Sequence, residues 1–306
     1  RPVGAATAAS SSSEESGADQ HTAPKHVPAR LNIGADSPVC EIETVGPSAV
    51  TWAWRAARTE PVVITGAGRG FCSGIDMRGF GPRLPEATDP AIDKLRFQET
   101  MAALPQAIRG IPQPVIAAVN GWAAGAGFYT LLSTTDIRIA SEENARFKFA
   151  LLSNGWVGGG PGATLLTRQI NYADAMRILL TDESFDAAEA LRIGLVNEVV
   201  PHDQLMDRAQ EVADLIVAKP PLATRMMKEF VIRFGDTPTE EAWRVQTLMN
   251  TLLTQLTTDG EEGRLAFQEK RKPKFTGGLR KKGEPFEELT EEQRERVDYL
   301  KRIGEV

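Results

Sequence analysis

Glycine residues gather in one stretch directly after a short apolar run near the start of the predicted core. The stretch reads ITGAGRGFCSGID and extends from Ile64 to Asp76. A dinucleotide-binding fingerprint is excluded because the sixth position, counted from Gly66, is Phe71. A serine nucleophile elbow is excluded because Ser73 lacks the surrounding G-x-S-x-G. Glycine also serves where a ligand approaches the main chain, so a tight turn and a ligand-binding backbone remain as interpretations.

Two further glycine clusters occupy similar places in the sequence. GWAAGAG, residues 121–127, follows the apolar run 115–119, and GWVGGGPG, residues 155–162, precedes a helical pattern at 163–169. In α/β proteins, ligands bind at the carboxyl ends of the strands, where strands turn into helices. The three clusters therefore predict a site at strand-to-helix junctions.

The elements that would position these clusters alternate between strand and helix, which is typical of an α/β fold. Periodicity predicts strands at 39–45, 62–65, 115–119 and 136–140, and helices at 48–58, 92–108, 163–169 and from the second cluster through 132. The second half is predominantly helical, with amphipathic segments at 173–180, 186–193, 203–217, 222–234 and 240–256. Such an appended helical layer commonly buries its faces against another subunit.

Composition limits the function classes. The 306 residues are 42% hydrophobic and 25% charged, as in ordinary globular proteins, and the net charge of −6 argues against nucleic-acid binding. The two cysteines form no C-x-x-C pair, so neither a disulfide framework nor a metal site is expected. The apolar runs fall far short of the ~20 residues of a membrane span, so no integral membrane segment is predicted.

The first thirty residues are rich in Ala, Ser, Pro and charged groups, and we expect a disordered tail. They contain no apolar core of a secretory signal, although an organelle transit segment is compatible with them. The expected compartment is therefore the cytoplasm or an organelle matrix, mitochondrial or peroxisomal, and not the outside of the cell.

Four segments in order resemble the crotonase superfamily, the enoyl-CoA hydratases and isomerases. They are TGAGRGFCSGIDM at 65–77, IPQPVIAAVNGWAAGAGFYTLLSTTDIRIASE at 111–142, DAAEALRIGLVNEVVP at 186–201 and TTDGEEGRLAFQEKRKPKF at 257–275. The resemblance implies a crotonase-like spiral of ββα units with a C-terminal helical trimerisation region. It also implies an acyl-CoA substrate, no cofactor beyond its coenzyme A, and a homotrimer or dimer of trimers.

The resemblance divides the chain into a tail at 1–30, a core at 31–200, a helical oligomerisation region at 201–275 and a charged extension at 276–306. The core is short at its start, where 39–60 replaces the two strands, turn and helix of the family. A truncated core, a mis-spliced gene and a diverged member are all compatible with this.

In the family, two backbone N–H groups stabilise the oxyanion or enolate that develops on the thioester. By position they are those of Ile75 and Ala126, with Gly127 if the register shifts by one. The neighbouring residues that would contact substrate are Cys72, Ser73, Gly74, Asp76, Gly125, Leu151 and Trp156. Lys270 and Lys274 would approach the nucleotide end of CoA, although a solvated basic face explains them equally well.

The two glutamates that hydratases of this family use are absent. The first position falls on Tyr129 or Thr130 and the second on Leu151, and no Asp or Glu occurs at 115–135 or 144–173. Because hydration needs a base and an acid, weak or absent hydration of crotonyl-CoA is expected. Thioester hydrolysis, decarboxylation or C–C cleavage remains open, with Tyr129, Ser153 and Asn154 as polar groups, and so does a catalytically inactive binding or assembly subunit.

Overall fold

The computed structural model describes residues 60–75, 92, 95, 99, 105–281 and 291–303. Its strands are β1 (Val62–Thr65), β2 (Gly70–Cys72), β3 (Val115–Val119), β4 (Trp122–Ala124), β5 (Ile137–Ser141), β6 (Arg146–Lys148), β7 (Phe185–Asp186) and β8 (Glu198–Val200). Its helices are α3 (Ala126–Thr134), α4 (Gly162–Gln169), α5 (Tyr172–Thr181), α6 (Ala187–Arg192), α7 (Leu205–Val217), α8 (Pro221–Phe234), α9 (Thr239–Leu256), α10 (Asp259–Gln268) and α11 (Glu291–Ile303), with short 3₁₀ helices η2 (Leu152–Asn154) and η3 (His202–Gln204).

The strands form two four-stranded sheets. The first has the order β1-β3-β5-β8 and is parallel throughout, and the second has the order β2-β4-β6-β7, with β7 antiparallel to β6. A strand of the first sheet is followed by one of the second three times along the chain, from β1 to β2, from β3 to β4 and from β5 to β6. This repeated crossing agrees with the predicted crotonase-like spiral.

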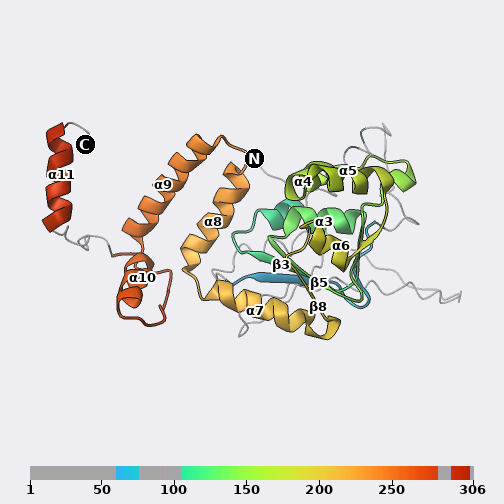
Figure 1. Ribbon diagram of the computed structural model, residues 1–306, viewed down its shortest axis with the longest axis horizontal. Helices are drawn as coiled ribbons and strands as arrows, with labels where there is room; N and C mark the ends of the chain where they lie inside the picture. The colour runs from blue at the N-terminus through green and yellow to red at the C-terminus, as the bar shows by residue number, and fades with distance from the viewer. Residues whose placement is uncertain are drawn as a thin grey trace, which may run out of the picture.

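The core lies on both sides of the first sheet. Every residue of β3 is buried, as expected of a continuous apolar strand in a parallel sheet. Helix α7 covers one face with Leu205, Ala209 and Val212, while α3 to α6 lie on the other (Figure 1). Phe128 of α3 meets Phe147, Phe149 and Phe185 edge to face, with ring centroids 5.8–6.3 Å apart. These aromatic contacts seat α3 on the second sheet.

Helices α8 to α10 extend away from the sheets (Figure 1). No described residue of α8 or α9 is buried when its backbone and side chain are taken together. Lys228 of α8 is an anchor to the core, because its side chain is only 7% exposed. Its Nζ lies 2.8 Å from the Asp136 carboxylate and donates to the Gln113 carbonyl at 2.7 Å. Burial lowers the pKa of Lys228, an effect that Asp136 opposes.

Most predicted elements agree with the structure to within a few residues, among them β1, β3, α4 and α5. The short strands β2, β4, β6, β7 and β8 were not predicted, and β4 occupies part of a cluster interpreted as a loop opening a helix. Strand 39–45 and helix 48–58 lie outside the described residues, and of the helix predicted at 92–108 only residues 92, 95, 99 and 105–108 are described, all of them helical. No helix in the described part of the chain is long and apolar enough to span a membrane.

Candidate active site

Three loops leave one edge of the second sheet. Strands β2, β4 and β6 are parallel neighbours, so the segments that follow them, beginning at Ser73, Gly125 and Phe149, emerge side by side. The carboxyl edge of parallel strands is where α/β folds bind their ligands. This topology places the first two glycine clusters, and the segment that leads to the third, at one edge of the sheet. The strands responsible, β2, β4 and β6, were not predicted.

The first two loops are in direct contact at two glycines. A Cβ atom on Gly74 would lie 2.8 Å from the Ala124 carbonyl oxygen and 3.1 Å from the Ala126 nitrogen, and Gly74 has a φ of +94°. A Cβ atom on Gly127 would lie 2.7 Å from the Cys72 Cβ and closer still to its carbonyl oxygen. Only glycine permits this approach. Ile75 and Ala126, the two predicted donors, therefore belong to one continuous patch of main chain.

Helix α3 begins in this patch without a side-chain cap. Its N-cap residue Gly125, at φ +53° and ψ −122°, contributes no capping side chain, and the first turn contains no acidic residue. The Gly125 N–H donates to the Lys148 carbonyl at 3.1 Å, which ties the helix start to β6. The positive end of the helix dipole, equivalent to about half a charge, thus points at the place where the thioester oxygen is expected.

The Asn120 side chain holds the first loop through three hydrogen bonds. Its Oδ1 accepts from the Gly66 N–H at 3.1 Å, and its Nδ2 donates to the Gly66 and Gly68 carbonyls at 2.9 Å each. Asn120 is buried, whereas Gly66 is half-buried and Gly68 is exposed, so this side chain ties a surface loop to the buried end of β3. Sequence reasoning did not assign a role to Asn120, although an Asn-Gly pair directly after a buried strand is a signal for a turn-forming side chain.

The third loop is held by a carboxylate that sequence reasoning missed. Asp182 accepts from the Ala150 N–H at 2.6 Å, from the Ser153 N–H at 2.8 Å and from the Ser153 hydroxyl. Asn154 donates to the Ala150 carbonyl at 3.0 Å, and the Trp156 N–H donates to the Leu151 carbonyl at 3.0 Å. The exposed Ser153 and Asn154 therefore lie on a well-ordered turn, and the hydroxyl of Ser153 is engaged with Asp182.

The glycines of the third cluster make room for the side chains at the two glutamate positions. A Cβ on Gly160 would lie 2.8 Å from the Tyr129 Oη. A Cβ on Gly158 would overlap Cδ1 of Leu151. Burial raises the pKa of the Tyr129 phenol, so this hydroxyl stays protonated at neutral pH. It is a hydrogen-bond or proton donor and not a base.

Comparison with known proteins identifies the family. The enoyl-CoA hydratase/isomerase family profile matches residues 51–278. This chain belongs to that family. It is 36% identical over 233 residues to the (E)-benzylidenesuccinyl-CoA hydratase of Thauera aromatica, covering 74% of this chain and 87% of that protein. It is 35% identical over 229 residues to an enoyl-CoA hydratase of Mycobacterium tuberculosis, covering 73% of this chain and 83% of its relative.

Solved structures agree. The crystal structure of an enoyl-CoA hydratase from Bacillus anthracis superposes with a TM-score of 0.68 at 30% identity, covering 75% of this chain and 86% of the other. The fold of this family member is thus the crotonase fold that its sequence predicted.

Within this family member, some predicted site residues are not brought together. Lys270 and Lys274 follow α10, which lies on the far side of α8 from the sheets (Figure 1). The Lys274 N–H donates to Glu262 at 2.6 Å, and Arg271 pairs with the same carboxylate. Asp76 lies outside the described residues, and Thr130 is half-buried on α3.

Proposed function

We propose that this protein processes an acyl-CoA thioester by stabilising an enolate or tetrahedral oxyanion at the N–H groups of Ile75 and Ala126, with Gly127 adjacent. One observation carries the proposal: Gly74 and Gly127 allow the loop after β2 to lie against the start of α3. Preorganised donors of this kind act where charge develops, and loss of one typically costs ~10²–10³ in rate. The proposal needs no cofactor beyond the coenzyme A of the substrate.

The side chains at the two glutamate positions distinguish this protein, in our proposal, from hydratases of the family. Leu151 cannot act as an acid or base, and the protonated phenol of Tyr129 can donate a proton but not accept one. Weak or absent hydration of crotonyl-CoA is therefore expected. Hydration of an enoyl-CoA, as the names of the relatives describe for those proteins, would require a carboxylate recruited from another segment.

A reaction that begins without a base fits these groups best. When a malonyl-type thioester loses CO₂, the electron pair of the broken C–C bond passes directly into the enolate, whose oxygen the two N–H groups would hold. The enolate carbon then takes a proton from the Tyr129 phenol, which is reprotonated by water. Thioester hydrolysis and C–C cleavage are alternatives that need water activation from elsewhere, and a catalytically inactive binding subunit is the rival of a different class.

The deciding experiment incubates the protein with enoyl-, β-keto- and malonyl-type CoA thioesters and follows products by mass, alongside a thermal-shift titration. A ligand at 100 times its Kd stabilises the folded state by ~2.7 kcal/mol. Turnover of at least one thioester is the expected result. Binding without turnover would favour the inactive subunit, and neither binding nor turnover with any CoA species would refute the proposal.

A variant pair tests the donor itself. Ala126 is the first residue of α3, a position where proline suits helix geometry. Ala126→Pro thus deletes the N–H while the helix can form, and turnover should fall ~10²-fold or more. Tyr172→Pro places proline at the first position of α5 and is the matched control, with turnover unchanged.

We also propose a homotrimer or dimer of trimers, in the cytoplasm or an organelle matrix. The large apolar side chains exposed on α8 and α9 are Met227, Val231, Trp243, Leu248, Leu252 and Leu256. Trp243 alone is 62% exposed, and such apolar helix faces are typical of subunit interfaces. Light scattering should report three or six chains at micromolar concentration. A monomer would refute this assembly.

A further inference from the structure

Asp182 is a buried carboxylate at a backbone position that few residues adopt. It ends α5 with φ +51° and ψ 30°, in the left-handed region, and is only 5% exposed. Its oxygens receive three hydrogen bonds from the third loop, from the N–H groups of Ala150 and Ser153 and from the Ser153 hydroxyl. A glycine or asparagine would meet the backbone requirement more easily. The carboxylate is therefore better explained by the loop it binds than by the helix it ends.

The sheet topology explains why this residue reaches the loop. Strand β7 runs antiparallel to β6, with Phe185 opposite Phe147. The segment just before β7 therefore lies beside the segment just after β6. Asp182 belongs to the former and Ala150 to the latter, although they are 32 residues apart in sequence.

The same loop is packed on the start of α3. The Lys148 carbonyl accepts from the Gly125 N–H at 3.1 Å, and the Ala150 Cβ lies 4.0 Å from where a Cβ on Gly125 would stand. Gly125 directly precedes Ala126. A path thus runs from Asp182 to the Ala150 N–H, along the chain to Lys148, and through the Lys148–Gly125 hydrogen bond to the residue before the proposed oxyanion donor.

We propose that Asp182 is a positioning residue of the active site. By fixing the turn at Ala150 to Ser153, it sets the direction of Leu151 and holds Gly125 so that the Ala126 N–H points at the thioester oxygen. This inference rests on the proposed function, because it assigns Asp182 a part in the same oxyanion site.

The charge of Asp182 suits this task. Burial alone would raise the pKa of the carboxyl, but hydrogen bonds from Ser153 and Ala150 outweigh it and leave the pKa below its ordinary value. The group is therefore ionised at neutral pH and accepts all three hydrogen bonds at once. Hydrogen bonds to a charged acceptor are about twice as strong as neutral ones, which favours a single loop conformation.

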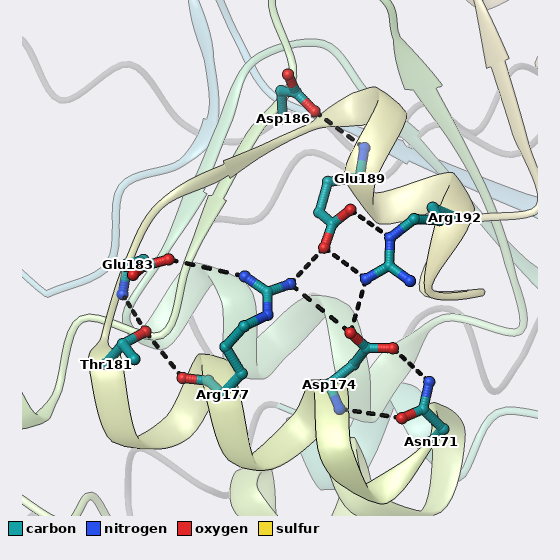
Figure 2. Close-up of polar contacts among 8 residues, drawn as sticks. All are labelled: Asn171, Asp174, Arg177, Thr181, Glu183, Asp186, Glu189 and Arg192. Carbon is teal, nitrogen blue, oxygen red and sulfur yellow. Dashed lines mark hydrogen bonds and ion pairs between the residues drawn. The ribbon is translucent and has the colours of Figure 1, made fainter.

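Figure 2 shows how the end of α5 is itself braced against α6. Arg177 pairs with Glu189 and, at 3.7 Å, with Glu183, while Arg192 bridges Glu189 and Asp174. Asn171 accepts from the Asp174 N–H at the start of α5, and Asp186 from the Glu189 N–H at the start of α6. These contacts join residues before and after Asp182 in the sequence, so they hold the end of α5, which carries the carboxylate, against α6.

The test uses acetoacetyl-CoA, a β-keto thioester whose enolate has its own ultraviolet band. The wild type should bind it and increase that band, because the N–H donors stabilise the enolate oxygen. Asp182→Asn retains size and the left-handed preference but turns an amide NH₂ toward the loop donors. We expect its enolate band to fall by ~10-fold to ~100-fold, as for a small misplacement of a catalytic group, while CoA still binds.

Asp182→Gly is the second variant, because glycine adopts the left-handed backbone without strain and removes the carboxylate altogether. It should lose the band to a similar extent. Asp236→Asn, the same change at a carboxylate that is 72% exposed on the turn between α8 and α9, is the matched control and should keep the band.

If both Asp182 variants fold and retain the wild-type band, the positioning role is refuted while the proposed function stands. If the wild type itself neither binds acetoacetyl-CoA nor shows the band, the proposed function is refuted, and the positioning role of Asp182 is refuted with it.

Discussion

Replacing Gly127 by alanine adds one methyl group at the junction that carries the proposed function. The new Cβ would overlap the Cys72 carbonyl oxygen and lie 2.7 Å from its carbonyl carbon, whereas ordinary contacts begin at 3.4 Å. Its neighbours are backbone atoms of β2, which cannot rotate away. The loop and the helix must therefore part by roughly 1 Å, a displacement that can cost on the order of 10²-fold in rate.

The effect on stability should be smaller than the effect on turnover. Overpacking of a buried site costs ~1–3 kcal/mol, and the better helix propensity of alanine returns ~1 kcal/mol. A net loss of ~0–2 kcal/mol lowers the Tm by only a few degrees in a chain of this size. Gly127→Ala should consequently fold, remain mostly native at 25 °C and yet turn over substrate at ~1% of the wild-type rate or less.

Gly263→Ala is the matched control. Gly263 also lies in a helix, α10, but a Cβ there would meet Phe275 at an ordinary 3.6 Å. That variant should gain up to ~1 kcal/mol in the free energy of unfolding and keep full turnover. Calorimetry and a turnover assay on both variants decide the matter. A folded Gly127→Ala protein with wild-type turnover would show that the contact between β2 and α3 does not position the reacting groups.

Further predictions concern two side chains of the site and one ion pair at α10. Asn120→Ala should cost ~1–2 kcal/mol in urea unfolding, because the half-buried main-chain groups of Gly66 lose their partner; an unchanged midpoint would refute the bracing role. Tyr129→Phe should lower turnover ~10²-fold or more without changing the Tm if the phenol donates the proton. Because burial raises the pKa of Tyr129, wild-type turnover should decline only above its ordinary value of 10.0. The hydrogen-bonded Arg271 guanidinium lowers the pKa of Glu262 to about 2 from 4.5. This pair therefore stabilises the folded state above pH 4.5 and ceases to do so as the pH falls toward 2. Glu262→Gln should lessen the dependence of the Tm on pH in this acid range.

The parts of the fold that the sequence predicted are those whose signal is local. Strand β3 is a run of five apolar residues, all buried, and the long amphipathic helices repeat their apolar residues over several turns. The strands that form the site edge are different. Strands β2, β4 and β6 have three residues each and include Gly70, Trp122 and Lys148, so their strand conformation is decided by pairing with neighbours rather than by composition.

The same distinction applies to the site. The resemblance to the enoyl-CoA hydratases, carried over by position, pointed to Ile75 and Ala126, and the structure places both segments together at Gly74 and Gly127. Asp182 could not be found in this way, because its partners Ala150 and Ser153 lie about thirty residues upstream and contribute mainly backbone N–H groups, which have no residue signature. The segments that line the site, 115–135 and 144–173, contain no Asp or Glu, so a search for carboxylates within them could not find Asp182.

The oxyanion patch is built from main-chain amides, and this has a consequence for how such a protein can diverge. Of the side-chain substitutions at position 126, only proline deletes the amide donor, so the charge-stabilising half of the proposed chemistry is encoded by backbone shape and is sensitive mainly at residues that set this shape, such as Gly74 and Gly127. The side chains at 129 and 151, by contrast, change with every substitution there. New reactions can therefore be tried by exchanging two residues on an unchanged scaffold, and enzyme engineers could begin with glutamate at Leu151 before altering anything else.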